Sequence, residues 1–507
     1  MRNSNTVILQ AVTEALETAI LPVVGTESGK SAAQLSLILL RLLLGRETGL
    51  VDLVDTEIES IGSLLAKMRT VTSTGEARGA SAHRLEAMDG ALGFAGNDRY
   101  GRSHMQLLQG QTQLAATAEE LIARGQSTDA ESGSPSVDPL LVEMATRELA
   151  FTRAVLSFVQ SPPNPADPKE SSGLTRDTLE RYLTQRFPER RNLVVTDMAG
   201  SGFSMSKQIL FFSIRDDSGK KEDLVLRQEK PVRWMEADCT LVKNEYALIQ
   251  CVYDMGLPVP EPLWLETGST LGPDFMVMRK VGGKQVGEPF KAYQPLSEEL
   301  IMQMAEILAS LHGAGLEPFE SFFRTTGQAA LLNMSLKEAT LHRINVWKTY
   351  FEHPNQFPSP GKAWLFDWLT RNVPNYTERP VMVHGDFNIH NLLADNGHIT
   401  TCLDWEWGHA GSALEDLYNI RPHVEKYSSW ERFYQHYQAH GGPDVQFNEE
   451  VLNYNRCLTN TIYSASGSKL ACNIAKREVN DLPAVFGANY YALEFHRVAL
   501  EASLKKH

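Results

Sequence analysis

Three polar residues in the last third of the chain have types and spacings that suit one reaction. Asp386 is followed by Asn391 five residues later and by Asp404 eighteen residues later. Each stands beside an apolar run that would bury its backbone and hold its side chain still. Phosphoryl transfer needs a carboxylate near the attacking hydroxyl and oxygen ligands for Mg²⁺ on the nucleotide. Because Mg²⁺ prefers hard oxygen donors and keeps several waters, one carboxylate and one amide are enough from the protein.

This requirement assigns a role to each residue. We predict that Asp386 orients the acceptor hydroxyl and is the catalytic residue, while Asn391 and Asp404 bind Mg²⁺. Isolated tripeptides around these positions would be chance matches, but their order and spacing together argue against chance. The alternative is a protein of the same fold that binds nucleotide without catalysis.

The sequence around these residues resembles that of a known family. The run HGDFNIHN at 384–391, followed by DWE at 404–406, resembles the signature of the aminoglycoside phosphotransferase-like kinases, which are distant relatives of protein kinases. The resemblance continues to Asp416, with Ala413 where the family usually has Pro, and LASLH at 308–312 matches a family helix. It implies a bilobal, protein-kinase-like α+β fold, ATP (or GTP) and Mg²⁺ as cofactors, and His384 and Asp416 as structural braces.

A kinase lobe also needs a loop over the phosphates, and the segment 199–204 is the candidate. Glycine lets backbone amides approach phosphate oxygens. The predicted phosphate-contacting residues of this loop are Gly200, Ser201, Gly202 and Ser204. The family has an Asn where this chain has Met205, and an ordinary hairpin turn is the alternative.

A permanent positive charge follows on the next strand-like run. Val225-Leu226-Arg227 resembles a family strand in which Arg replaces the Lys of protein kinases, and Arg can grip phosphate with two donors. The resemblance gives Glu245 as its partner. It also assigns the adenine contact to the backbone of Val277 and Met278, although Arg279 stands where the family usually has an acid.

Composition limits the other classes of function. The formal net charge is −14, which argues against a nucleic-acid partner. Five scattered cysteines without a CxxC pair favour a reducing compartment. The most apolar stretch, 35–44, has ten residues including Arg41 and is too short to span a membrane. We therefore expect a cytoplasmic enzyme without a membrane partner.

Hydrophobic periodicity divides the chain into four parts. Helical spacing at 4–24, 31–46, 51–70, 104–124 and 138–160 predicts an all-helical module over 1–160, and a Pro-rich linker follows at 161–173. A helix from Thr175 opens a β-rich lobe at 174–283, with strands near 193–195, 208–214, 223–227 and 275–281 and one helix at 239–254. The remainder, 284–507, is predicted to be a helical lobe that carries the catalytic loop and the acceptor site.

The acceptor is less constrained than the reaction. The VLR strand, the turn GLPVP at 256–260 and a Trp-bearing helix around 343–347 look more like the branch associated with acyl-CoA dehydrogenases, which contains kinases of hydroxyacyl-CoA thioesters. We expect a small hydroxyl acceptor, with a hydroxyacyl-CoA or related hydroxy acid first. An antibiotic or amino-alcohol acceptor is the alternative. The N-terminal module could serve homodimerisation or scaffolding.

Overall fold

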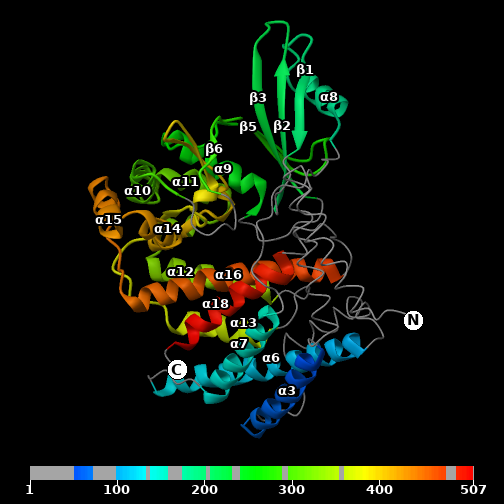
Figure 1. Ribbon diagram of the computed structural model, residues 1–507, viewed down its shortest axis with the longest axis vertical. Helices are drawn as coiled ribbons and strands as arrows, with labels where there is room; N and C mark the ends of the chain where they lie inside the picture. Colours follow the sequence, from blue (N-terminus) through cyan, green and yellow to red (C-terminus); the bar gives the residue numbers. More distant parts are fainter. Residues whose placement is uncertain are drawn as a thin grey trace.

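Two regions of different secondary structure lie at opposite ends of the computed structural model (Figure 1). A β-rich lobe is at one end and the helices from the N-terminal part of the chain are at the other, with the helical lobe between them. The structure describes residues 51–71, 99–132, 138–157, 174–200, 206–230, 240–287, 295–352, 359–475 and 487–505. The predicted helices at 4–24 and 31–46, the linker at 161–173, and Ser201, Gly202 and Ser204 lie outside these residues.

The β-rich lobe is a five-stranded antiparallel sheet in the order β1-β2-β3-β5-β4. Its strands are β1 (Val194–Gly200), β2 (Lys207–Arg215), β3 (Lys221–Glu229), β4 (Pro262–Glu266) and β5 (Phe275–Arg279). Side chains of a strand alternate between the two faces of a sheet. On β5, Phe275 and Val277 therefore pack under helix α8 (Arg176–Arg186), and Met276 and Met278 pack with helix α9 (Val242–Asp254). The sheet is thus covered by one helix on each face.

Helix α8 begins where the sequence predicted. Thr175 is its N-cap, and the Thr175 and Thr178 side chains form a reciprocal capping box. Such caps satisfy backbone donors that the first helical turn leaves without partners. The cap, together with Leu179 and Leu183 buried against the sheet, fixes the start of the lobe.

The helical lobe holds the remaining strands in two small sheets. One has the order β6-β8-β9 and the other pairs β7 with β10. The strands are β6 (Lys284–Gln285), β7 (Val381–Val383), β8 (Leu392–Asp395), β9 (His398–Cys402) and β10 (His409–Gly411). The helices are α10 (Glu298–Gly313), α11 (Glu320–Thr325), α12 (Leu336–Phe351), α13 (Pro360–Arg371), α14 (Leu414–Tyr427), α15 (Trp430–Ala439), α16 (Glu449–Ala475) and α18 (Ala492–Leu504). These sheets set the position of the loop that follows β7.

The N-terminal helices share a hydrophobic core with the helical lobe. Helices α3 (Val51–Val71), α6 (Arg99–Ser132) and α7 (Pro139–Ser157) pack with α12, α13, α16 and α18 in one cluster of buried side chains. Buried Glu148 on α7 accepts hydrogen bonds from the backbone of Gly361 at 2.6 Å and from His496 at 2.7 Å. The described part of the module is therefore built into the lobe, whereas the domain boundaries remain predictions.

The predicted element types are largely confirmed. The predicted helices at 51–70, 104–124 and 138–160 are present as α3, α6 and α7, with α6 longer at both ends. The four predicted strands of the β-rich lobe are present, and β4, β6 and β10 were not predicted from the sequence. Glu449 and Glu450 are exposed at the start of α16, as expected of a solvated helix start.

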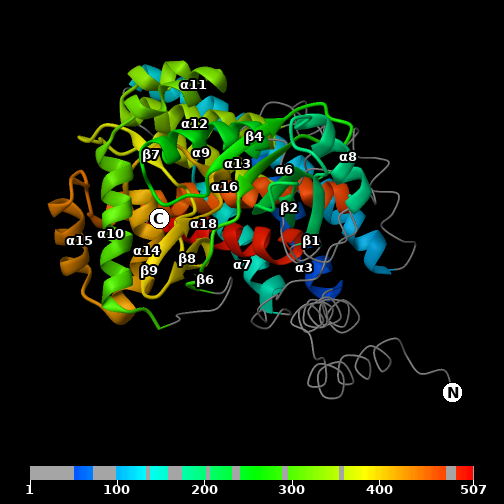
Figure 2. The ribbon, with the colours of Figure 1, turned by 90° about the horizontal axis from the view of Figure 1, so that it is seen from above.

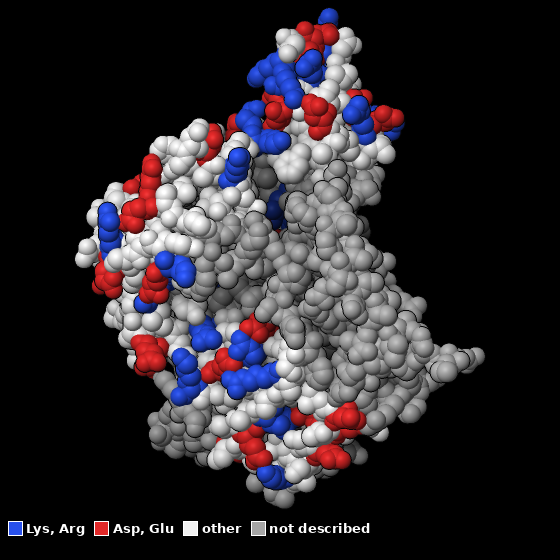
Figure 3. All heavy atoms as spheres, in the orientation of Figure 1, with Lys and Arg blue, Asp and Glu red and all other residues white. Residues whose placement is uncertain are grey.

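Two further features describe the surface and the helices. Basic and acidic side chains are interspersed over the described part of the face in Figure 3, so neither sign dominates it. None of the described helices combines the length and apolar composition that crossing a bilayer requires.

Candidate active site

The loop after β7 brings Asp386 and Asn391 into contact. The Asn391 side-chain amide donates to the backbone oxygen of Asp386 at 2.9 Å and to its carboxylate oxygen Oδ2 at 3.0 Å. A short 3-10 turn, Ile389–Asn391, creates this geometry because it turns the chain back toward Asp386. The amide oxygen of Asn391 is an acceptor and takes no part in either bond. It is the atom with which Asn391 would bind a metal.

The Asp416 carboxylate holds the start of this loop through hydrogen bonds to its backbone. Asp416, fully buried on α14, accepts from the backbone N–H groups of His384 at 2.7 Å and Gly385 at 2.9 Å. His312 on α10 lies 3.2 Å from the same carboxylate and 3.0 Å from the hydroxyl of Tyr437 on α15. Burial opposes ionisation of Asp416, but His312 and the loop amides keep its pKa below the usual value.

The ring of His384 links the two halves of the site. Its Nδ1 accepts from the backbone N–H of Asp386 at 3.2 Å, so Nε2 carries the proton and donates to the carbonyl oxygen of Leu403 at 2.9 Å. Burial lowers the pKa of His384, which keeps the ring neutral. His384 is thus placed as a brace between the loop and the residue before Asp404.

Gly385 is required by its conformation and by its neighbour. Its φ is +81°, and a Cβ there would lie 2.4 Å from the carbonyl oxygen of Trp407. A side chain would clash with the backbone and would also strain this torsion. The carbonyl oxygen of Gly385 accepts from the hydroxyl of Tyr463 on α16 at 2.7 Å, so α16 also supports the loop.

Asp404 faces the β-rich lobe from the end of β9. Its φ of 68° is left-handed, a conformation uncommon for residues other than glycine and often found at functional sites. Arg227 on β3 donates to the Asp404 carboxylate and, through Nε, to Glu245 on α9 at 3.0 Å. Burial alone would raise the pKa of Asp404, but the positive charge of Arg227 outweighs burial and lowers this pKa. Arg227 therefore connects β3, α9 and the segment that carries Asp404.

Three charged residues that were not predicted from the sequence extend the ion pairs of Arg227 into a buried charge cluster. Lys207, at the start of β2, is 2% exposed and lies 3.4 Å from Glu229 and 3.5 Å from Glu406. Glu406 is also 3.6 Å from Arg227. The sequence contained a signal for these residues, because Lys207 begins one apolar strand and Glu229 ends another. Charged residues in such positions are rarely buried without partners.

The buried cluster contains more negative than positive charge. Among the described residues, its acidic members are Glu229, Glu245, Asp404 and Glu406, and its basic members are Lys207 and Arg227, so four carboxylates face two cations. Burial, together with neighbouring carboxylates, raises the pKa of Glu245 to about 7 and raises that of Glu406. A divalent cation near Asp404 would offset part of this negative charge. The residues present therefore fit Mg²⁺, which Asn391 and Asp404 would hold through their side-chain oxygens.

Comparison with known proteins agrees with this geometry. Residues 211–451 match the sequence profile of the phosphotransferase enzyme family. This segment belongs to that family. The family resemblance predicted from the sequence is thereby confirmed. The match begins inside β2 and ends in α16, so the phosphotransferase domain contains Arg227, Glu245, Asp386, Asn391 and Asp404.

The relatives with similar sequences include two acyl-CoA dehydrogenase family members. The chain is 24% identical over 261 residues to acyl-CoA dehydrogenase family member 11 of Gallus gallus, a match covering 50% of this chain and 32% of that protein. It is 24% identical over 290 residues to family member 10 of Mus musculus, covering 54% and 24%. The chain thus spans about a third or less of the length of these relatives.

The solved structures have lower identity. A putative aminoglycoside phosphotransferase from Ralstonia eutropha is 15% identical with a TM-score of 0.44, covering 64% of this chain and 97% of that one. The macrolide 2′-phosphotransferase of Brachybacterium faecium is 17% identical with a TM-score of 0.38, covering 60% and 99%.

Of the residues predicted to contact the nucleotide, Gly200 lies before the segment that matches the family, and Val277 and Met278 lie inside it. Gly200 is the last residue of β1 and pairs with Leu210. Val277 is in the middle of β5, paired with both β3 and β4, and its side chain packs on the α8 face. Met278 packs on the opposite face, toward the helical lobe. The contact of the Val277 and Met278 backbone with the base therefore stays a prediction.

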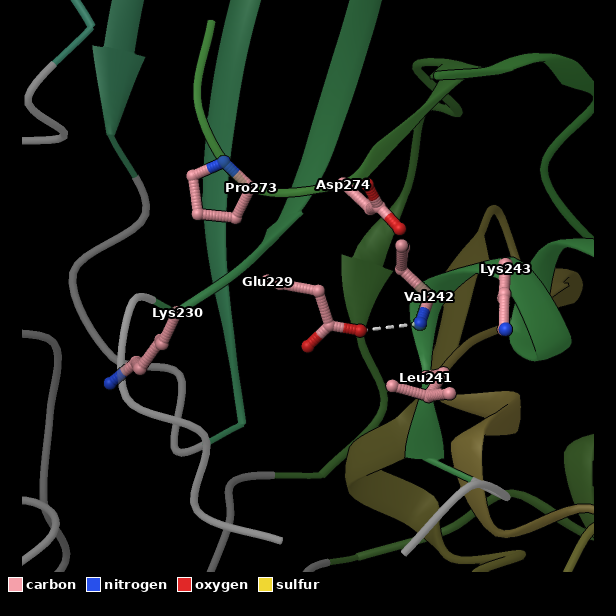
Figure 4. A pocket seen from close by; sticks show the side chains of 7 residues that line it. All are labelled: Glu229, Lys230, Leu241, Val242, Lys243, Pro273 and Asp274. Atoms are coloured by element: carbon pink, nitrogen blue, oxygen red, sulfur yellow. Dashed lines mark hydrogen bonds between the residues drawn. The ribbon is translucent and has the colours of Figure 1, made fainter. Parts of the chain in front are cut away.

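A hollow of about 280 Å³ lies at the N-terminus of α9 rather than beside Asp386. Its lining residues are Glu229, Lys230, Leu241, Val242, Lys243, Pro273 and Asp274, shown in Figure 4. Within it, Glu229 accepts from the backbone N–H of Val242 at 2.6 Å, which satisfies the first turn of the helix (Figure 4). Glu229 thus holds α9 in place and connects this hollow to the buried charge cluster.

Proposed function

We propose that the chain transfers the terminal phosphoryl group of ATP to a hydroxyl group of a small metabolite, with Mg²⁺ as the metal. The observation that carries the proposal is the convergence of Asp386, Asn391 and Asp404 with Arg227 reaching Asp404 from the other lobe. This arrangement provides a carboxylate for the acceptor, oxygen ligands for a metal and a fixed cation for phosphates. The N-terminal helices would stabilise the lobe that carries these groups.

In the proposed reaction the acceptor oxygen attacks the γ-phosphorus and the bond to the β,γ-bridging oxygen breaks. ADP leaves with the electron pair, and the hydroxyl proton passes to the carboxylate of Asp386. Asn391 fixes that carboxylate through Oδ2, which leaves Oδ1 for the hydroxyl. Mg²⁺, when bound, would neutralise phosphate charge beside Asp404. Arg227, held by Glu245, would hold the phosphates in line.

For the acceptor we propose a hydroxyacyl-CoA or a related hydroxy acid. A cationic antibiotic would need carboxylates with unsatisfied charge near the transfer site. Glu415 is buried beside this region, but its charge is met by Arg343 and by His409 at 3.3 Å. Burial alone would raise the pKa of Glu415, and those two partners outweigh it and hold the pKa below its usual range. The names of the acyl-CoA dehydrogenase relatives support the same class of acceptor.

The test is an ADP-release assay on the purified full chain with ATP, Mg²⁺ and a panel of acceptors. The panel contains 3- and 4-hydroxyacyl-CoAs, the free hydroxy acids, aminoglycosides, macrolides and amino alcohols. Turnover of hydroxyacyl-CoAs, lost in Asp386→Asn, is the expected result. Turnover confined to antibiotics or amino alcohols would reject the acceptor class. Nucleotide binding without turnover on any acceptor would favour a non-catalytic protein.

A further inference from the structure

A group of side chains of the types that bind metal ions lies on the helical lobe, outside the charge cluster around Arg227. It consists of Glu306 on α10, and His436 and His440 at the end of α15, with one ligand atom of each within 4.8 Å of the others. We propose that these three residues form a binding site for a transition-metal dication of the Zn²⁺ class. The proposal does not depend on the identity of the acceptor.

The hydrogen bonding of His440 prepares one ligand atom. Its Nδ1 lies 2.8 Å from the carbonyl oxygen of His436, one helical turn earlier. Because a carbonyl oxygen can only accept, Nδ1 carries the proton and Nε2 of the neutral ring has the lone pair. That Nε2 lies 3.9 Å from Oε1 of Glu306. A histidine whose second nitrogen donates to a backbone carbonyl is the usual arrangement in metal sites, because this bond fixes the ring orientation.

His436 and Glu306 supply the other two ligands. Nε2 of His436 lies 2.8 Å from the same Oε1, and the two imidazole rings are 4.1 Å apart between centroids. Without metal, His436 donates this nitrogen's proton to the carboxylate. A cation entering between them would take the lone pair of Nε2, with the proton moving to Nδ1 or to water. Two imidazoles and one carboxylate favour Zn²⁺, Ni²⁺ or Cu²⁺ over Mg²⁺ and Ca²⁺, and water would complete the coordination.

The backbone around the site is fixed by contacts unrelated to metal. Helices α10 and α15 lie side by side in Figures 1 and 2. A Cβ on Gly313, at the end of α10, would lie 2.4 Å from the carbonyl oxygen of Gly441, so the two helix ends touch. Between the ligands, Tyr437 turns into the core and contacts His312 on α10. The ligand-bearing turns are therefore held in register before any ion binds.

The same helices hold the brace of the catalytic loop. His312 and Tyr437, which connect α10 to α15, lead to Asp416 and so to the amides of His384 and Gly385. An ion bound by Glu306, His436 and His440 would clamp the two helices on their outer side. We therefore expect it to stabilise the folded chain in addition to binding, since a ligand specific for the native state raises its stability.

The test uses calorimetric titration of Zn²⁺ into the untagged full chain, with excess Mg²⁺ present to occupy the catalytic ligands. Wild type should bind one equivalent tightly and show a higher Tm with Zn²⁺. The double variant His436→Gln/His440→Gln should bind at least roughly 10–100-fold more weakly and lose the Tm increase. The matched control is His398→Gln, which removes an exposed histidine 3.9 Å from Glu299 and should leave both results unchanged.

Two further measurements separate the site from incidental binding. Co²⁺ bound to wild type should show visible d–d absorption of four- or five-coordinate nitrogen and oxygen ligation, and Glu306→Gln should reduce it. Equal Tm values without metal would show that the variants fold normally. Equal Zn²⁺ affinity in wild type and the double variant, or equal loss in the His398 control, would overturn the proposal.

Discussion

The side-chain amide of Asn391 donates to the Asp386 carboxylate at 3.0 Å and to the Asp386 backbone oxygen at 2.9 Å. One residue thus orients the proposed base and retains an oxygen for the metal. The two functions can be separated by substitution, because Asp at 391 keeps an oxygen ligand but has no amide to donate.

We expect Asn391→Asp to lower kcat roughly 10²–10⁴-fold, comparable to Asp386→Asn, since a second carboxylate repels and misorients the first. The measurement is steady-state kinetics over a range of Mg²⁺ concentrations. If Asn391 served only the metal, Asn391→Asp would bind Mg²⁺ at least as well and retain most of kcat.

The pH dependence should report Asp386. Burial, with the nearby Asp404 carboxylate, raises the pKa of Asp386 to about 8. A group that accepts a proton must start deprotonated, so kcat/KM should rise with pH through this value. Saturating Mg²⁺ beside Asp404 should shift the rise to lower pH, because it offsets the charge that raises the pKa. A profile that is flat over this range, or unmoved by Mg²⁺, would contradict the assignment.

The raised pKa of Asp386 also predicts that a substitution of Asp386 that removes activity increases the stability of the fold. The pKa of Asp386 is above its unfolded value of 3.8, so ionisation is harder in the folded state and destabilises the protein as pH rises from about 4 to 8. Asp386→Asn removes the ionisable group and should raise stability at pH 8 by about 1–2 kcal/mol. Thermal unfolding of both proteins should give different Tm values at pH 8 and similar values at acidic pH. A lower Tm for the variant at pH 8 would show that the carboxylate stabilises the fold.

Stability should depend more on the positive charge of Arg227 than on the shape of its side chain. Arg227→Met leaves the carboxylates of Glu245, Asp404 and Glu406 with one cation fewer in a buried cluster, which should cost about 3–5 kcal/mol. Arg227→Lys keeps the charge, and we expect folding close to wild type with a KM for ATP raised roughly tenfold, because Lys lacks the planar fork. Arg215→Met, at an exposed position on β2, is the control and should change neither. Equal denaturant midpoints for Arg227→Met and the control would contradict the proposed role.

Glu148 should be a point of attachment between the N-terminal helices and the helical lobe. It accepts from Ser359 at 3.0 Å as well as from Gly361 and His496, so Glu148→Ala would leave buried donors without an acceptor. We expect a loss of about 3–5 kcal/mol in urea unfolding. Glu143→Ala, on the same helix but with a half-exposed side chain, should change stability by less than about 1 kcal/mol. Similar effects of the two variants would mean that α7 is not held by this contact.

How much of this could be predicted from the sequence depended on how local the signal was. Helix α8, with Thr175 as N-cap, and strands β1, β2, β3 and β5 were predicted because caps and alternation are encoded in neighbouring residues. Asp386, Asn391 and Asp404 were predicted because the chemistry restricts their types and the family pattern their spacing. Strand β4 was missed because Pro262 and Pro260 break the pattern that identifies a strand.

The long-range features could not be predicted in the same way. Lys207, Glu229 and Glu406 are separated by up to 199 positions, and only folding brings their charges together. The same holds for the contacts of Glu148, which decide that the N-terminal helices share the core of the helical lobe. Helical periodicity shows that a face is apolar, but it does not show which partner will cover it.

This shared core also constrains how the chain folds during synthesis. Glu148 and His496 are 348 residues apart, so α7 leaves the ribosome long before α18 exists to receive it. At about 5–20 residues per second the delay is roughly 20–70 s. Throughout that interval the apolar face of α7 has no native partner from α18, whereas the β-rich lobe can form as soon as β5 has emerged. The phosphotransferase domain is therefore expected to begin folding from its β-rich lobe, and α7 is expected to complete its packing among the last.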